Sequence, residues 1–317
     1  MFGIPQQTVI VATLWMTGTL ISFMALAIGG RELSAHLGTI QILFFRSLVG
    51  LCAINALLIK RDRRLVLTQN FGLHLVRNLA HFGGQFGWFY GLAYISLAEV
   101  FAIEFTLPIW TGIFARVLLK EPLTKPRLMA IGFGIAGMLI ILRPGLGVID
   151  PAAWAVLAGA VCYALSHTLT RKLALRDSPL TILFYMTVIQ LPLGLLPSLS
   201  HWTIPSYTLL PWLAIVGLAA LSAHYCMAKA LALVDATVVV PMDFLRLPLI
   251  ALVGFMFYGE PLDQFVLTGA TLMLIGNVIN IRAEQHRKSA PAIQNPVGET
   301  KTAPQYSFDS ESTADSS

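Results

Sequence analysis

The sequence is short of charge. Only 12% of its 317 residues are charged and 56% are hydrophobic, with a mean hydropathy of +0.74, whereas about 25% of residues are charged in an ordinary soluble domain. Such a chain has too little polar surface to cover a soluble core, which indicates an integral membrane protein. The formal net charge of +5 is spread over short loops between apolar runs, so no nucleic-acid partner is expected.

Cysteine and catalytic motifs are also scarce. The three cysteines, Cys52, Cys162 and Cys226, lie in separate apolar runs, which excludes a disulfide framework and gives no reason to expect a metal or a cofactor. No H-E-x-x-H, G-x-S-x-G or P-loop pattern occurs, so we expect no catalytic residues and no direct drive by ATP. The run GFGIAG at 132–137 matches a dinucleotide-binding pattern, but inside an apolar span its glycines favour helix packing.

Long apolar runs are abundant. About 20 residues of helix cross a bilayer core of about 30 Å, and the sequence predicts an all-α polytopic membrane protein. The predicted spans number ten: 8–28, 38–59, 71–91, 98–119, 128–142, 152–172, 179–199, 209–230, 236–257 and 263–282. Pro144–Gly145 is expected to end the fifth span. Residues 283–317 are rich in Ser, Ala, Pro and Thr, so we expect a disordered tail.

The loops between these spans differ in charge. One set of alternate loops carries ten basic residues: Lys60, Arg61, Arg63, Arg64, Lys120, Lys125, Arg127, Arg171, Lys172 and Arg176. The opposite set carries only Arg31 and Arg143. The positive-inside rule then predicts that both termini are cytoplasmic. No Lys or Arg precedes the first apolar run, so we expect no cleavable signal peptide.

The chain repeats itself. An offset of 139 places Glu104 on Asp243 and K-E-P-L (120–123) on G-E-P-L (259–262). The sequence therefore predicts two units, 8–142 and 152–282, each with five helices. Because five is odd, the second unit enters the membrane from the opposite side, and the two form an inverted repeat, a plan that many secondary transporters use.

The two units resemble the EamA domains of the drug/metabolite transporter superfamily. The resemblance depends on the small-residue helix end, the intramembrane proline, the (K/G)-E-P-L turn and the glycine-bearing fifth helix, and it covers residues 8 to 282. It implies a transporter in the inner membrane. Members carry amino acids, nucleotide derivatives, vitamins, sugars, metallophores or drugs, so the resemblance leaves the solute and the direction of transport open.

Five charges lie deep in predicted spans: Glu104 and Asp243, with Arg46, Arg77 and Arg246. A charge near the bilayer centre costs roughly 2.5–3.5 kcal/mol on insertion scales, so such residues face the bundle interior or water. We expect each unit to contribute one acid to a shared cavity, where it holds an amine, pairs with an arginine or carries a proton. Asp243 and Arg246 share a helix face and can pair. Three cations against two anions favour an anionic or zwitterionic solute, and Arg46 and Arg77 are left open between packing and binding.

The third span carries a polar stripe. Its members share one helix face: His74, Arg77, Asn78, His81 and Gln85. The stripe predicts a lining of the translocation path, with interhelical hydrogen bonding as the alternative. Gln85 falls on His224 under the 139 offset. Trp15 and Tyr163 occupy similar places in the first and sixth spans, where an aromatic stacking role is the less favoured interpretation beside packing.

Together these features predict a secondary transporter of a small organic metabolite, either proton-coupled or an exchanger. A passive facilitator or channel, and a membrane-embedded enzyme, remain as alternatives. The lipid bilayer and the metabolite are the expected partners, and a second copy of the chain is kept as a candidate.

The topology can be tested directly. A reporter that is active only in the periplasm, fused after Arg287, should be silent, because an even number of spans and the loop charges place this end in the cytoplasm. The same reporter fused after Arg31 should be active. A positive signal after Arg287 would contradict both the number of spans and the inverted arrangement.

Overall fold

The computed structural model describes residues 6–59, 67–120, 124–143, 149–234, 239 and 242–289, and these residues are helical apart from short connections. Several predicted features lie outside the described residues: the basic residues of the loop 60–66, the turn at 121–123, Pro144–Gly145 and the tail from residue 290.

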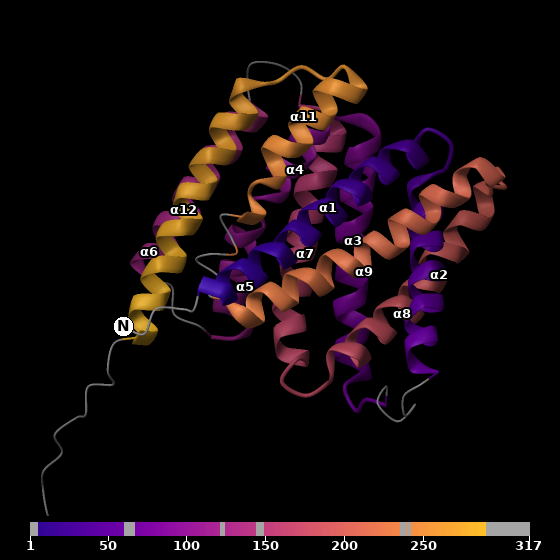
Figure 1. Ribbon diagram of the computed structural model, residues 1–317, viewed down its shortest axis with the longest axis horizontal. Coiled ribbons are helices and arrows are strands. Elements are labelled where there is room, and N and C mark those ends of the chain that lie inside the picture. Colours follow the sequence, from indigo (N-terminus) through magenta and orange to yellow (C-terminus); the bar gives the residue numbers. More distant parts are fainter. Residues whose placement is uncertain are drawn as a thin grey trace, which may run out of the picture.

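The helices follow one another with turns of a few residues between most of them (Figure 1). The α-helices are α1 (Gln6–Ser34), α2 (Thr39–Leu58), α3 (Phe71–Tyr94), α4 (Leu97–Glu104), α5 (Leu107–Leu118), α6 (Lys125–Leu142), α7 (Pro151–Leu173), α8 (Pro179–Ser198), α9 (Leu210–Leu233), α11 (Arg246–Tyr258) and α12 (Gln264–Ser289). Two short 3₁₀ helices, η2 (Leu199–His201) and η3 (Tyr207–Leu209), join α8 to α9.

Most predicted spans coincide with a helix, but several boundaries differ. α1 continues to Ser34 instead of ending at residue 28, and α12 continues to Ser289, past the predicted end at residue 282. The first part of the predicted tail is therefore helical. Eight segments of the described residues are long and apolar enough to cross a membrane. α3, with its polar stripe, and α11, with 13 residues, are not among them.

Two predicted spans, 98–119 and 236–257, each contain a helix break that the sequence analysis did not identify, although Leu97–Leu118 still counts as one apolar span. α4 ends at Glu104, and α5 begins at Leu107 after a turn at Phe105–Thr106. In the second half the helical residues 242–243 are followed by a turn at Phe244–Leu245, and α11 begins at Arg246. Pro108 and Pro248 lie just beyond these turns. A proline donates no backbone hydrogen bond and crowds the carbonyl four residues earlier, which breaks the helix.

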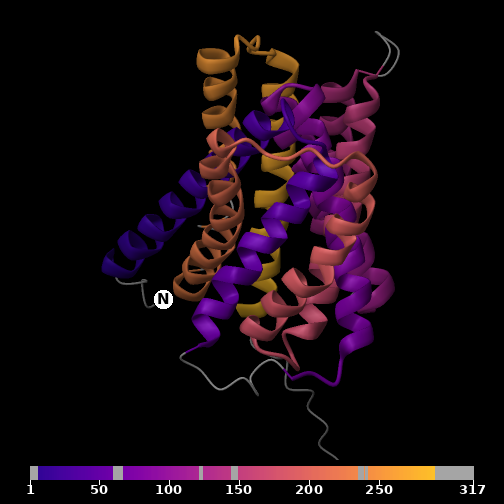
Figure 2. The ribbon, with the colours of Figure 1, turned by 90° about the vertical axis from the view of Figure 1, so that its right-hand side faces the viewer.

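The two halves of the chain are interlocked. The first helix of each half packs on the third helix of the other half, α1 on α9 and α7 on α3. Two further pairs join equivalent helices, namely α2 with α8 and α6 with α12, and α4 of the first half packs on α11 of the second. The α6–α12 pair and the α2–α8 pair lie on opposite sides of the bundle, with α1, α3, α7 and α9 between them (Figures 1 and 2). Neither half therefore buries its helices alone.

Glycines set the closest of these approaches. A Cβ atom added to Gly137 of α6 would lie 2.5 Å from the carbonyl oxygen of Gly269 in α12, and one added to Gly269 would lie 2.5 Å from the carbonyl oxygen of Gly137. The two backbones touch here, as small residues permit between helices in lipid. This contact assigns the predicted packing role to Gly137, the last glycine of the GFGIAG run.

The G-E-P-L turn has a special backbone. Gly259 follows α11 with φ of 65° in the left-handed region, and Lys120, its equivalent in the first half, has φ of 57°. Glycine adopts this conformation without a steric penalty. In the second half this turn, which contains Glu260, ends α11 and joins it to α12 at the end of the bundle that lies at the top of Figure 1, called the upper end below.

The α6–α12 contact can be tested by adding a single methyl group. Gly137→Ala should lower the melting temperature of the detergent-purified protein, because overpacking a tight contact costs about 1–3 kcal/mol. Gly132→Ala is the matched control in the same helix, since nothing lies within 4 Å of a Cβ added there. An equal effect of the two substitutions would show that this approach does not limit stability.

Candidate functional site

Three charged side chains meet at the two helix breaks. Arg246 Nη2 donates to Asp243 Oδ2 at 2.7 Å, and Arg246 Nη1 lies 3.6 Å from Glu104 Oε1. The arginine is 5% exposed, so one buried cation lies between two acids from different halves of the chain. We call Glu104, Asp243 and Arg246 the acid–arginine cluster. The expected pair of Asp243 with Arg246 is present, and Glu104 joins it.

The breaks bring these residues together. Glu104 is the last residue of α4, Asp243 precedes the second turn, and Arg246 is the first residue of α11. The two turns lie against each other, since the rings of Phe105 and Phe244 stack with centroids 4.1 Å apart. Both breaks therefore lie directly beside the residues of the cluster.

Apolar and aromatic groups enclose the cluster. The Arg246 guanidinium lies 4.3 Å from the ring centroid of Phe23 and 5.3 Å from that of Phe105, distances at which a cation is attracted to an aromatic face. Trp88 Nε1 donates to Glu104 Oε2 at 2.9 Å. Each acid therefore has a specific partner, and Trp88 is a contact that the sequence analysis did not identify.

The polar stripe of α3 points into the bundle, and all five of its members are buried. Arg77 Nε donates to Thr170 Oγ1 of α7 at 2.9 Å, and Arg77 Nη1 donates to Asn78 Oδ1 at 2.6 Å. His74 Nε2 lies 3.0 Å from Asp177 Oδ2 in the turn between α7 and α8. Arg77 thus has neutral partners, whereas His74 has an acidic one.

Further along the stripe, a cluster of amides surrounds one imidazole. His81 Nδ1 lies 2.6 Å from Gln85 Nε2 and 2.9 Å from Gln190 Nε2 of α8. These contacts tie α3 to α8, as the hydrogen-bonding alternative for the stripe requires. Gln190 was not among the predicted residues, although an amide inside the apolar seventh span, 179–199, was a visible signal.

The remaining predicted residues lie on the four central helices. The ring of Tyr163 in α7 lies 5.4 Å from His81, Trp15 in α1 meets Tyr225 of α9 at 5.8 Å, and His224 of α9 meets Phe23 at 5.9 Å. Trp15 and Tyr163 thus contact different partners. His224 is exposed, and so is His167 of α7. His224 lies about one helical turn beyond Ala220 of α9, which lines the small space beside Arg46.

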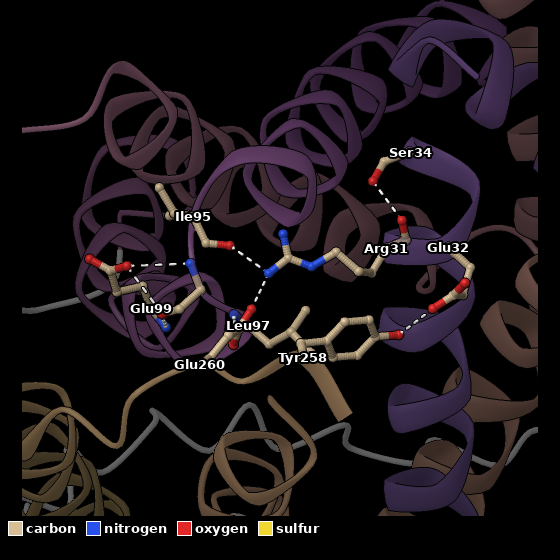
Figure 3. Close-up of polar contacts among 9 residues, drawn as sticks. Arg31, Glu32, Ser34, Ile95, Leu97, Glu99, Tyr258 and Glu260 are labelled. Atoms are coloured by element: carbon tan, nitrogen blue, oxygen red, sulfur yellow. Dashed lines mark hydrogen bonds and ion pairs between the residues drawn. The ribbon is translucent and has the colours of Figure 1, made fainter. Parts of the chain in front are cut away.

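A polar network joins the helices at the upper end (Figure 3). Arg31 at the end of α1 forms an ion pair with Glu260 and donates to the carbonyl oxygen of Ile95 at 3.0 Å. Glu260 Oε2 accepts from the Leu97 backbone at 2.9 Å, and Tyr258 donates to Glu32 at 2.7 Å. We call Arg31, Glu260 and their backbone partners the upper latch. It ties the turn after α11 to α1 and to the start of α4.

Local sequence prepares one side of the latch. Ser96 caps α4 by accepting from the Glu99 backbone at 3.1 Å, and Glu99 Oε2 accepts from the Ser96 backbone at 3.4 Å. This reciprocal pair is a capping box, whose S-x-x-E pattern marks the start of the helix. A cavity of about 520 Å³ lies beside it, lined by residues that include Tyr94, Glu99 and Arg143. None of the predicted site residues lines this cavity.

The latch can be tested by removing one charge. Glu260→Gln should lower the melting temperature, because a hydrogen bond to a charged group contributes about 1.5–3 kcal/mol when its partners are shielded from water. Asp263→Asn is the matched control, since the Arg143–Asp263 ion pair has side chains that are 34% and 27% exposed, against 19% and 14% for Arg31 and Glu260. A surface pair contributes only about 0–1 kcal/mol. A larger effect at Asp263 would refute the importance of the latch.

Comparisons with known proteins agree with this architecture. The description "EamA-like transporter family" matches residues 10–143 and again residues 150–282. A solved crystal structure shares the fold with a TM-score of 0.62 and 15% identity, covering 88% of this chain and 99% of the other. The S-adenosylmethionine uptake transporter of Rickettsia bellii is 24% identical over 87% of this chain and 94% of its own.

Two other relatives carry different names. The riboflavin transporter of Vibrio cholerae is 32% identical over 67% of this chain and 72% of its own. The pseudopaline exporter of Pseudomonas aeruginosa is 24% identical over 80% of this chain and 90% of its own. The expected resemblance is therefore confirmed, and the chain, a multi-pass membrane protein with two EamA repeats, belongs to the EamA-like transporter family.

Proposed function

We propose that this protein is a secondary active transporter of the inner membrane. It has ten spans in two inverted repeats, and it carries a small organic metabolite across the membrane through a site between the repeats. The reciprocal packing of the halves supports this arrangement. The contact of α1 with α9 and the contact of α7 with α3 are equivalent, because each joins the first helix of one half to the third helix of the other. Two halves related in this way can open a central site to one side and then to the other.

The number of ten spans adds two segments to the eight apolar ones. α3 has 24 residues, enough to cross a bilayer core of about 30 Å, and its polar stripe is shielded by α7 and α8. α11 completes a span with the residues that precede its break. One set of alternate loops carries ten basic residues and the other carries two. The positive-inside rule then predicts that both termini, and the end of the bundle opposite the upper end, lie in the cytoplasm.

The upper latch supports a path that is closed toward the periplasm in this conformation. It joins α1, α4 and the turn after α11 at that end. By contrast, His167 lies 16 residues from the start of α7 at Pro151 and is exposed, which puts it about 24 Å toward the cytoplasmic end at 1.5 Å per residue. Alternating access requires the latch to break when the opposite end closes.

The solute class follows from charge. The interior holds Arg46, Arg77 and Arg246 against Glu104 and Asp243, a balance that favours an anionic or zwitterionic metabolite, such as an amino-acid derivative, a metallophore or a vitamin. Relatives are named for S-adenosylmethionine, riboflavin and pseudopaline, so the family does not fix one solute. The proposed binding and translocation residues are Trp15, His74, Arg77, Asn78, His81, Gln85, Glu104, Tyr163, His224, Asp243 and Arg246.

The acid–arginine cluster supports coupling to protons. Its two acids share one arginine, and Asp243 Oδ1 is buried without a hydrogen-bond partner among the described residues. A single cation leaves the pair one negative charge in excess, and a proton would remove it. A passive facilitator needs no proton-binding group, so the cluster favours a coupled carrier over a facilitator. An enzyme is distinguished by experiment, because it would change its substrate.

The acids can be tested in proteoliposomes with labelled riboflavin and S-adenosylmethionine as first solutes, followed by a wider metabolite panel. Glu104→Gln or Asp243→Asn should abolish accumulation driven by a pH gradient yet retain exchange. The amides keep the shape and much of the hydrogen bonding but carry no titrating proton.

Asp263→Asn, at the upper end, is the control and should keep both activities. A carrier shows stimulation by solute on the opposite side, which a pore does not. Unchanged accumulation in both acid variants would exclude them as the proton carriers and leave a structural ion pair.

A further inference from the structure

The three deep arginines are compensated very differently. Arg246 lies between two acids, and Arg77 is held by the neutral oxygens of Thr170 and Asn78. Arg46 of α2 is 7% exposed, its Nε atom is completely buried without a partner, and no described residue accepts a hydrogen bond from it. Arginine does not lose its proton in proteins, so this cation needs an anion or water.

The described acids are engaged elsewhere. Glu104 and Asp243 serve Arg246, Asp177 serves His74, and Glu260 serves Arg31. The remaining acidic side chains that the structure describes bind Tyr258, Ser96, the α7 N-terminus and Arg143, and these are Glu32, Glu99, Asp150 and Asp263. An anion for Arg46 therefore has no source among the described side chains.

The surroundings of Arg46 restrict how an anion reaches it. The space beside Arg46 has a volume of about 10 Å³ and is lined by α8, with Gln190, and by α9, with Ala220, so it holds about a single water. His224 follows Ala220 by four residues, about one helical turn further along α9, and is exposed. An anion would approach along α9 from the side of His224.

We infer that Arg46 is the residue that receives the anionic group of the transported solute, and that this group is a single carboxylate. The planar guanidinium fork matches a carboxylate in a bidentate pair. When both acids are ionised, one negative charge balances the excess of three central cations over two acids, whereas a doubly charged phosphate would not. This assignment rests on the proposed transport function. It gives the binding of the solute's anionic group to Arg46 instead of Arg246, because Arg246 already pairs with two acids.

The field of Arg46 can be measured without knowing the solute. In a variant whose three native cysteines are replaced by alanine, His224→Cys provides a reporter thiol at the exposed position. The purified protein is treated with the anionic sulfonatoethyl and the cationic trimethylammonium-ethyl methanethiosulfonate, and the ratio of the two rates is recorded. Arg46→Gln should lower the ratio of anionic to cationic rate at least about fivefold, because a nearby buried charge is weakly screened.

Two variants control this measurement. Arg46→Lys keeps the charge and should keep the ratio, and Lys229→Gln, which removes an exposed cation of α9, should change it much less. An unchanged ratio in Arg46→Gln, or a reporter that reacts with neither reagent, overturns the assignment.

A second measurement needs no change at Arg46. Benzoate should slow the anionic reagent at the reporter, and uncharged benzyl alcohol at the same concentration should not. Equal effects of the two compounds overturn the carboxylate assignment even if Arg46→Gln fails to fold. Neither measurement requires transport. If the labelling result is positive but no transport is found in proteoliposomes, the proposed transport function is rejected and the anion site at Arg46 is retained.

Discussion

The structure depends on one constraint: a charge inside the membrane must find its partner within the protein. Arg246 meets it with two acids, one from its own half and one from the other. Both helix breaks, the stacked Phe105–Phe244 pair and the hydrogen bond from Trp88 to Glu104 surround this contact. The prolines that interrupt the helices thus shape the centre of the molecule.

The lipid environment also constrains the contacts between helices. Lipid provides little hydrophobic drive for helices to associate, so close packing through small residues holds them together. The mutual approach of Gly137 and Gly269 closes one side of the bundle, and Gly87 brings α3 against the backbone of α7. These glycine contacts are tight and apolar, whereas the upper latch is polar and made at helix ends. A movement that breaks the latch but keeps the glycine contacts would preserve the helix pairs as rigid units.

The central arginines form a graded series. Arg246 is fully compensated by acids, Arg77 by neutral oxygens, and Arg46 by no described residue. All three side chains are buried, so their partners distinguish them. A residue that is already neutralised gains little from a solute anion, while an uncompensated one gains the most. This difference separates the proposed coupling role of the acid–arginine cluster from the proposed binding role of Arg46.

The sequence alone determined the membrane class, the two repeats and the family, because hydropathy, loop charge and a fixed offset are properties of the chain order. It also placed most helices and the charged residues within them. It missed both helix breaks, since Pro108 and Pro248 look compatible with a bent but continuous span. Only the tertiary structure decided which charge meets which: Glu104 and Asp243 are 139 residues apart, and no local pattern reveals that Arg246 lies between them or that Glu260 reaches Arg31. Partner choice is a property of packing, and packing joins residues that are distant in the chain.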